Sequence, residues 1–199
     1  MLMDSTVSAF LPTNSGDFQI FSFPGEEIPV LPDIALVHGV IVPDSVVLLR
    51  IHSECLTGDV FGSQRCDCGQ QLKVALEYIG KSGGLLIYLR QEGRGIGLHS
   101  KIEAYKIQES GMDTVQANTE LGFKPDERNY EAALKILKFF GISKVRLLTN
   151  NPDKIAALEL GGISILERIP LSFPSNPFND KYLKTKRDKM GHILPKIKE

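Results

Sequence analysis

The hydrophobic pattern of the chain changes its period near Gly69, and this change limits the possible folds more than any other feature. Before it, four short runs rich in β-branched and aromatic residues predict strands at 7–11, 18–23, 34–40 and 46–51. The turn-rich stretch 12–16 joins the first two runs and predicts a hairpin. After Gly69, helical spacing alternates with short apolar runs. Antiparallel strands followed by alternating helices and strands predict a mixed α/β fold around one mixed sheet.

The second part of the chain should contain four helices and three strands. Apolar residues at 72, 75, 76 and 79 have helical spacing and predict a helix that ends at Ser82-Gly83-Gly84. Further helices are expected at 97–110, through 130–140 and from Asn151 onward, and strands at 85–89, 145–149 and 163–169. Residues 172–199 should form a loop, at 172–177, and a basic tail around 181–189. One domain is expected to span 1–199.

Size and charge exclude several classes of protein. A chain of 199 residues is long enough for one domain that buries about 70% of its unfolded surface. Lys+Arg is 23 and Asp+Glu is 24, a balance that disfavours a protein whose main task is to coat nucleic acid or an anionic membrane. No apolar run approaches the roughly 18–20 residues that span a bilayer, and residues 1–12 lack the pattern of a signal peptide. We expect a cytoplasmic protein with no nucleic-acid or membrane partner.

The three cysteines are clustered, since Cys55, Cys66 and Cys68 fall within fourteen positions. An odd, clustered set argues against a disulfide framework and toward metal chemistry. Three protein ligands with an open fourth position are typical of a catalytic zinc site that carries water. Two alternatives remain: a structural zinc completed by His52 or a distant group, and buried cysteines that act as small hydrophobes. Because three thiolates make the site electron-rich, a separate general acid or base is expected nearby.

A glycine-rich turn at 90–98 follows the expected strand 85–89 and leads into a helix. Strand, glycine-rich turn and helix together form a general anion site, because free backbone N–H groups point outward at the start of the helix. Glu92 in this turn could accept hydrogen bonds from the N1–H and 2-amino groups of guanine. An exposed loop glutamate is the alternative.

Two other helix starts carry cations. Asp126 and Asn151 are good N-cap residues for the third and fourth helices. Arg128 and Lys154 would then lie in the first turns, where a cation opposes the helix dipole. A bound polyanion such as a triphosphate would reverse that penalty, and a solvated surface charge is the alternative for each residue.

These motifs resemble those of one family, GTP cyclohydrolase II. The matching stretches include 50–59 (RIHSECLTGD), 65–69 (RCDCG), 90–98 (RQEGRGIGL) and 146–152 (RLLTNNP), within a match that runs in order from Thr6 to His192. The resemblance implies a zinc ion, one per chain, held by Cys55, Cys66 and Cys68. It further implies that the guanine imidazole ring of GTP is opened at C8, with release of formate and, with the help of Mg²⁺, of diphosphate. The product would be 2,5-diamino-6-(5-phosphoribosylamino)pyrimidin-4(3H)-one, the first intermediate of riboflavin biosynthesis.

The same resemblance assigns roles to single residues. It makes Asp126 the proton acceptor and Arg128 the nucleophile toward the α-phosphate, and it places Tyr105 beside the reacting base. The residues that would bind GTP are Arg50, Ile51, His52, Ser53, Glu54, Gln71, Glu92, Gly93, Arg94, Thr114, Thr149 and Lys154. The family also suggests a homodimer. A guanidinium with a pKa above 12 is a poor nucleophile, so a clamp on the α-phosphate is the alternative role for Arg128.

Two other functions are compatible with the motifs. One is a diverged cyclohydrolase that stops at a formamide intermediate, although the retained Tyr105 favours the complete reaction. The other is a zinc-stabilised domain that senses nucleotides without turning them over. Many relatives carry a preceding butanone-phosphate synthase domain. Since strand signals begin at Val7, we expect no room for it in these 199 residues.

Overall fold

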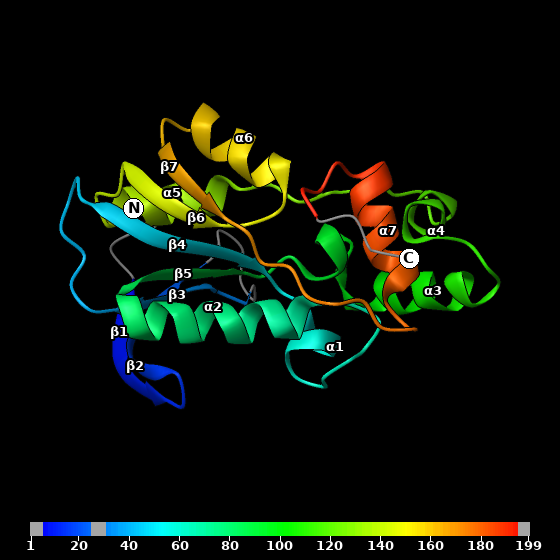
Figure 1. The fold of residues 1–199 in the computed structure, drawn as a ribbon, viewed down its shortest axis with the longest axis horizontal. Coiled ribbons are helices and arrows are strands. Elements are labelled where there is room, and N and C mark those ends of the chain that lie inside the picture. The colour runs from blue at the N-terminus through cyan, green and yellow to red at the C-terminus, as the bar shows by residue number, and fades with distance from the viewer. Residues whose placement is uncertain (1–5, 25–30, 195–199) are drawn as a thin grey trace.

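Seven strands form one mixed sheet in the order β1-β2-β3-β5-β4-β6-β7 (Figure 1). The structure is a computed structural model that describes residues 6–24 and 31–194. The strands are β1 (Val7–Thr13), β2 (Gly16–Phe23), β3 (Asp33–His38), β4 (Val46–Ser53), β5 (Gly84–Leu89), β6 (Lys144–Leu148) and β7 (Ser164–Ile169). Antiparallel pairing joins β1, β2, β3 and β5, whereas β5, β4, β6 and β7 are mutually parallel. The predicted mixed α/β fold, with its N-terminal hairpin, is confirmed.

Helices cover both faces of the sheet. Helix α2 (Cys68–Ser82) packs on one face, and α5 (Glu131–Phe139) and α6 (Pro152–Leu160) pack on the other (Figure 1). Strand β4 shows how the sequence sorts residues between them, because successive side chains of a strand point to opposite faces. Leu49 and Ile51 belong to the core under α5 and α6, whereas Leu48 belongs to the core under α2. Arg50 and His52 therefore share the α2 side of the strand with Leu48.

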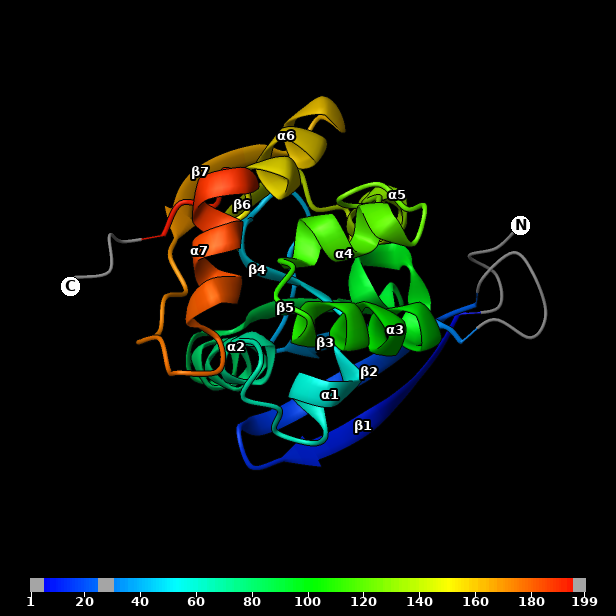
Figure 2. The same ribbon diagram turned by 90° about the vertical axis from the view of Figure 1, so that its right-hand side faces the viewer.

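The remaining helices gather beyond the carboxyl ends of β4, β5 and β6. They are α1 (Leu56–Asp59), the 3₁₀ turn η2 (Glu92–Gly95), α3 (Gly97–Glu109), α4 (Thr114–Glu120) and α7 (Asp180–Lys189). Figure 2, which views this end of the molecule, shows α1, α2, α3, α4 and α7 around it. In sheets with parallel strands, ligands bind at the carboxyl ends where neighbouring strands connect to helices on opposite faces. The fold thus points to this end as the functional one.

Three expectations about helices are wrong. The third helix begins at Glu131, so Asp126 and Arg128 precede it and Asp126 does not cap it. Asp126 Oδ1 instead accepts from the backbone N–H of Arg128 at 3.1 Å, a local turn that competes with helix formation.

The basic segment 181–189 is not a tail but helix α7, in which Leu183, Thr185 and Lys186 are buried. Residues 195–199 of the expected tail lie outside the described residues.

The short helices α1 and α4 were not expected either. The start of α4 does carry a sequence signal, since Asp113 and Gln116 form a reciprocal capping box. None of the described helices is both long and apolar enough to cross a bilayer.

Helix α2 touches the hairpin so closely that one position in it must be glycine. A Cβ added to Gly80 would lie 1.8 Å from the carbonyl oxygen of Ser15, in the turn between β1 and β2. We predict that Gly80→Ala lowers the free energy of unfolding by about 1–3 kcal/mol, because the helix must move off the sheet. The measurement is urea denaturation followed by circular dichroism.

The matched control is Lys73→Ala, an exposed position in the same helix. It should change stability by no more than about 0.5 kcal/mol. In a helix without the contact, Gly→Ala stabilises by up to about 1 kcal/mol, so a Gly80→Ala variant at least as stable as the wild type would contradict the close approach.

Candidate active site

The three cysteines meet at the carboxyl end of β4. Cys55 lies between β4 and α1, Cys66 lies in the following loop, and Cys68 is the first residue of α2. Their sulfur atoms lie within 4.8 Å of one another, and Cys55 Sγ and Cys66 Sγ are 3.7 Å apart. Among the residues that the structure describes, this is the one cluster of potential ligand atoms from histidine, cysteine and acidic side chains. His52 is not part of it, which removes the basis for a site closed by His52.

The cluster fits a tetrahedral metal ion. Zinc–sulfur bonds of about 2.3 Å in a tetrahedron place two sulfurs about 3.8 Å apart. A Cβ on Gly58 would lie 3.0 Å from Cys66 Sγ and 3.2 Å from Cys55 Sγ, so glycine leaves just enough room for the thiols. Hydrogen bonds from the other two thiols lower the pKa of Cys55, whereas the proximity of Cys55 raises those of Cys66 and Cys68. The Cys55 thiolate therefore forms readily, whereas a divalent cation would be needed to stabilise all three cysteines as thiolates.

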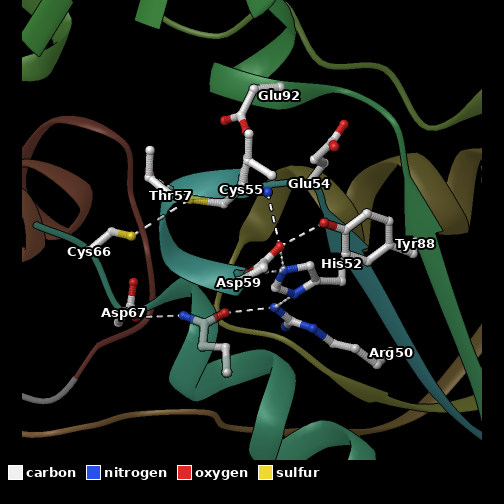
Figure 3. Close-up of polar contacts among 12 residues, drawn as sticks. Arg50, His52, Glu54, Cys55, Thr57, Asp59, Cys66, Asp67, Tyr88 and Glu92 are labelled. Carbon is white, nitrogen blue, oxygen red and sulfur yellow. Dashed lines mark hydrogen bonds and ion pairs between the residues drawn. The ribbon is translucent and has the colours of Figure 1, made fainter. Parts of the chain in front are cut away.

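A buried carboxylate holds the segment that leads into the cluster (Figure 3). Asp59 accepts hydrogen bonds from His52 Nε2 at 3.1 Å, from the Tyr88 hydroxyl at 2.8 Å and from the backbone N–H of Cys55 at 3.0 Å. His52 stacks on the Tyr88 ring, with centroids 5.4 Å apart. Burial lowers the pKa of His52, and the opposing effect of its hydrogen bond to Asp59 is smaller, so the imidazole is neutral. The Asp59 side chain thus ties together strand β4, strand β5 and Cys55.

A second chain of polar contacts runs from β4 to the C-terminal helix. Arg50 Nη2 donates to Gln71 Oε1 at 2.7 Å, and Gln71 Nε2 donates to Asp67 Oδ2 at 2.5 Å (Figure 3). The other oxygen of Asp67 accepts from Lys186 Nζ of α7 at 2.8 Å. Burial would raise the pKa of Asp67, but the ion pair with Lys186 outweighs it and lowers the pKa. Since Asp67 lies between Cys66 and Cys68, α7 is fastened directly to the segment that carries these two cysteines.

Buried cations line another part of the same pocket. Lys154 is 5% exposed and donates to the carbonyl oxygen of Ile51 at 2.8 Å. Burial first, and then the charges of Arg50 and Arg128, hold its pKa well below the usual range. Burial likewise lowers the pKa of Arg50 to about 10, and its Nε has no hydrogen-bond partner among the described residues. Cations buried this close together make a positive site that an anionic ligand would stabilise.

The glycine-rich turn contributes a third wall and carries backbone strain. Gly93 and Arg94 both have left-handed conformations, with φ of 63° and 65°. For a residue other than glycine such a conformation costs about 1–3 kcal/mol and is typical of functional sites. The backbone N–H of Glu127 donates to the Arg94 carbonyl oxygen at 3.0 Å, which joins this turn to the segment of Asp126 and Arg128.

Comparison with known proteins agrees with this geometry. A sequence model described as GTP cyclohydrolase II matches residues 4–170. The chain belongs to the GTP cyclohydrolase II family. It is 50% identical over 187 residues to GTP cyclohydrolase-2 of Picrophilus torridus, which covers 94% of this chain and 96% of that protein. It is also 52% identical over 195 residues to riboflavin biosynthesis protein RibBA of Bacillus subtilis, covering 97% of this chain and 49% of that one. The chain thus spans about half the length of the RibBA relatives.

Most residues that the GTP cyclohydrolase II resemblance singles out line this one pocket. They are Arg50, His52, Ser53, Glu54, Cys55, Cys66, Cys68, Gln71, Glu92, Gly93, Arg94, Tyr105, Thr114, Arg128, Thr149 and Lys154. Ile51 differs, because its side chain is fully buried in the core and only its carbonyl oxygen faces Lys154. Asp126 is not among the residues that line the pocket, but it forms an ion pair with Arg128, which is.

Sequence reasoning gave several residues of the site no role, although Asp59 lies in the matching stretch 50–59 and His192 ends the match. Asp59 and Lys101 contact Cys55 directly, and Tyr88 does so through Asp59. Helix α7 adds Tyr182 and Lys186, and His192 follows it, although all three lie beyond the residues that the family model matches. The only signal for α7 in the sequence analysis was its run of positive charges, which predicted a tail and not a helix.

Arg128, which lines the pocket, forms a close ion pair with Asp126. Arg128 Nε donates to Asp126 Oδ1 at 2.8 Å, and Nη2 donates to Oδ2. Burial opposes the charged form of both residues, but their hydrogen bonds outweigh it. As a result, the pKa of Arg128 is raised and the pKa of Asp126 is lowered. The pair makes Arg128 harder to deprotonate and Asp126 a weaker base. This geometry favours a charged, oriented guanidinium.

His192 supplies a pH test of the positive pocket. Burial and then the charges of Lys186, Arg128 and Arg94 lower its pKa to about 3, while its Nδ1 faces the Met190 carbonyl oxygen. The unfolded chain takes up a proton at His192 below pH about 6.5, so we predict that the folded state loses stability as pH falls through this range. At pH 5 the loss is about 2 kcal/mol relative to pH 8.

The measurement is the free energy of unfolding in urea at pH 8 and pH 5. In His192→Gln the difference between the two pH values should shrink by about that amount. His99→Gln changes a histidine whose side chain is 91% exposed and should leave the difference as in the wild type. Equal pH dependence in His192→Gln and the wild type would show that the pocket does not keep His192 neutral.

Proposed function

We propose that the protein is a zinc-dependent GTP cyclohydrolase II. It would open the imidazole ring of guanine at C8, release formate and diphosphate, and form 2,5-diamino-6-(5-phosphoribosylamino)pyrimidin-4(3H)-one for riboflavin biosynthesis. The observation that carries the proposal is that three clustered thiols and a group of buried cations face one pocket. The proposed reaction of a purine triphosphate needs both groups, since a Lewis acid would act at the base and positive charge would act at the phosphates.

The thiols would serve the base. A zinc ion held by Cys55, Cys66 and Cys68 would supply an acidified water for attack on an electron-poor purine carbon, as in zinc deaminases. Tyr105 lies beside this position, with its hydroxyl 3.4 Å from Thr57 Oγ1 and the Arg65 guanidinium 4.4 Å from its ring centroid. Burial raises the pKa of Tyr105, so its hydroxyl stays protonated and can donate a hydrogen bond to the reacting ring.

The cations would serve the phosphates. Arg50, Lys154 and Arg128 are already desolvated, so their interaction with a polyanion would be stronger than that of surface charges. At the start of α6 the backbone N–H of Asp153 already donates to the Asn151 side chain at 2.9 Å and Pro152 has no N–H, so the charged side chains would supply most of the phosphate contacts. We propose that Asp126 orients Arg128 as a clamp on the α-phosphate. The roles of proton acceptor and nucleophile, implied by the resemblance, remain predictions.

Some further expectations are kept as proposals. They are Mg²⁺ bound with the triphosphate, a homodimer, a cytoplasmic location and a single domain over 1–199. The continuous sheet of the described residues supports the last of these.

The decisive experiment identifies the products. We predict that metal-loaded protein with GTP and Mg²⁺ yields formate, diphosphate and the pyrimidinone ribosyl phosphate, as measured by mass spectrometry. Cys66→Ser should lose its zinc and at least about 100-fold in formate release, because a ligand is removed. A product that keeps the formyl group would indicate the diverged cyclohydrolase, and tight GTP binding without turnover would indicate the sensing domain. Full zinc content and turnover in Cys66→Ser would refute the metal site.

The two candidate roles of Arg128, a clamp on the α-phosphate or a nucleophile, lead to different expected results. Arg128→Ala should lower turnover by about 10²–10³-fold through loss of charge stabilisation, and added guanidinium ion should restore part of it. Wild-type protein quenched during turnover should show no covalent nucleotide adduct in its intact mass. Arg146→Ala, which removes an arginine whose side chain is 42% exposed in β6, is the control and should leave turnover unchanged. An adduct that disappears in Arg128→Ala would establish the nucleophile.

A further inference from the structure

Lys101 of α3 points directly at the metal-binding segment. Its Nζ lies 3.2 Å from Cys55 Sγ, 3.0 Å from Thr57 Oγ1 and 2.7 Å from Glu92 Oε1. The side chain is 10% exposed. An ammonium group has three N–H donors, and each of them has an acceptor here. Lys101 thus has no donor left for a substrate and is directed at a sulfur that would bind the metal.

Glu92 is equally occupied by groups of the chain itself. One oxygen accepts from Lys101 Nζ and from the Gly93 N–H at 2.7 Å, and the other accepts from the Leu56 N–H at 2.6 Å. A carboxylate has about four acceptor positions, so three of them are used. Its side chain is 9% exposed. Glu92 joins the residue after Cys55 to the glycine-rich turn and to Lys101, and it is poorly placed to accept two further bonds from guanine.

The charges explain what this arrangement achieves. Three thiolates and a divalent cation carry a net charge of −1, which burial makes unfavourable. An ammonium beside Cys55 offsets that charge, and its N–H···S bond draws electron density from this sulfur. A sulfur that gives less electron density leaves the metal a stronger Lewis acid. Partners of metal ligands commonly tune a site in this way.

We propose that Lys101 is a positioning residue that orients and polarises the metal ligand Cys55, and that Glu92 acts by holding Lys101. This inference rests on the proposed function, because it requires a metal ion at the cysteine cluster. It separates the role of Glu92 from recognition of the base, so that guanine is read by other groups of the pocket.

The first test is spectroscopic and uses the 199-residue protein loaded with Co²⁺. A more electron-rich thiolate transfers charge to cobalt at lower energy, so Lys101→Met should move the sulfur-to-cobalt band to longer wavelength. Lys101→Arg keeps a cation and should return the band at least halfway to the wild-type position. Lys106→Met, the same change at an exposed position of α3, should leave the band unchanged. Should Lys101→Met not fold, Lys101→Gln removes the charge with a polar side chain and is expected to shift the band in the same direction.

The second test asks whether Glu92 acts through Lys101. Glu92→Gln and Lys101→Met should each lower the kcat of formate release by about 10- to 100-fold. The double variant should be no worse than the poorer single variant, because the two residues act as one unit. The preference for GTP over ITP in kcat/KM should stay within about twofold of the wild type in both variants. A preference that collapses at least about tenfold in Glu92→Gln alone would show that Glu92 reads guanine.

The outcomes separate this inference from the proposed function. Wild-type protein that binds no metal at the cysteines would overturn both. Wild-type protein that binds one metal ion and releases formate, with an unshifted cobalt band in folded, loaded Lys101→Met, would overturn only the role of Lys101. Additive losses in the double variant would overturn the coupling of Glu92 to Lys101.

Discussion

The hydrogen bonds accepted by the Asp59 carboxylate determine the arrangement of the site. This group binds His52 of β4, Tyr88 of β5 and the backbone N–H of Cys55. Leaving any of these buried donors unpaired costs about 1–3 kcal/mol, so the three bonds set the direction in which the chain leaves β4. That direction brings the sulfur of Cys55 to 3.7 Å from that of Cys66, with α1 and the loop after it between the two residues. The cysteine cluster is therefore an extension of the sheet.

The alternation of β4 then links the two halves of the pocket. Leu49 and Ile51 fill one core, so Arg50 and His52 must point to the opposite face, towards α2. From Arg50 the polar contacts continue through Gln71 and Asp67 to Lys186 of α7. As a result, Arg50, the loop that carries Cys66 and the C-terminal helix share one connected network. A change at either end of that network should be felt at the cysteines, because its members are buried and bonded in series.

Strong periodicity explains why most strands and long helices could be predicted to within a few residues. The errors arise where local and distant contacts compete. Asp126 has the side chain of an N-cap, but it bonds Arg128 instead, and the helix starts only at Glu131. Helix α7 has a weakly apolar pattern because part of its buried face is Lys186, and a lysine is buried only when a partner such as Asp67 is present. That partner lies 119 residues away in the chain.

The sequence by itself determined the chemistry available to this protein. Three cysteines within fourteen positions, a glycine-rich turn after a strand and cations at expected helix starts identified the family and most of the pocket residues. Only the tertiary structure decided how these groups are paired: Asp59 with His52, Lys101 with Cys55 and Glu92, Lys186 with Asp67. Such pairs depend on the strand order β5-β4-β6 and on which helix covers each strand end. Spacing along the chain carries no such information, because hydrogen bonds and ion pairs act over a few ångströms, and these partners are separated by as few as 7 and as many as 119 residues alike.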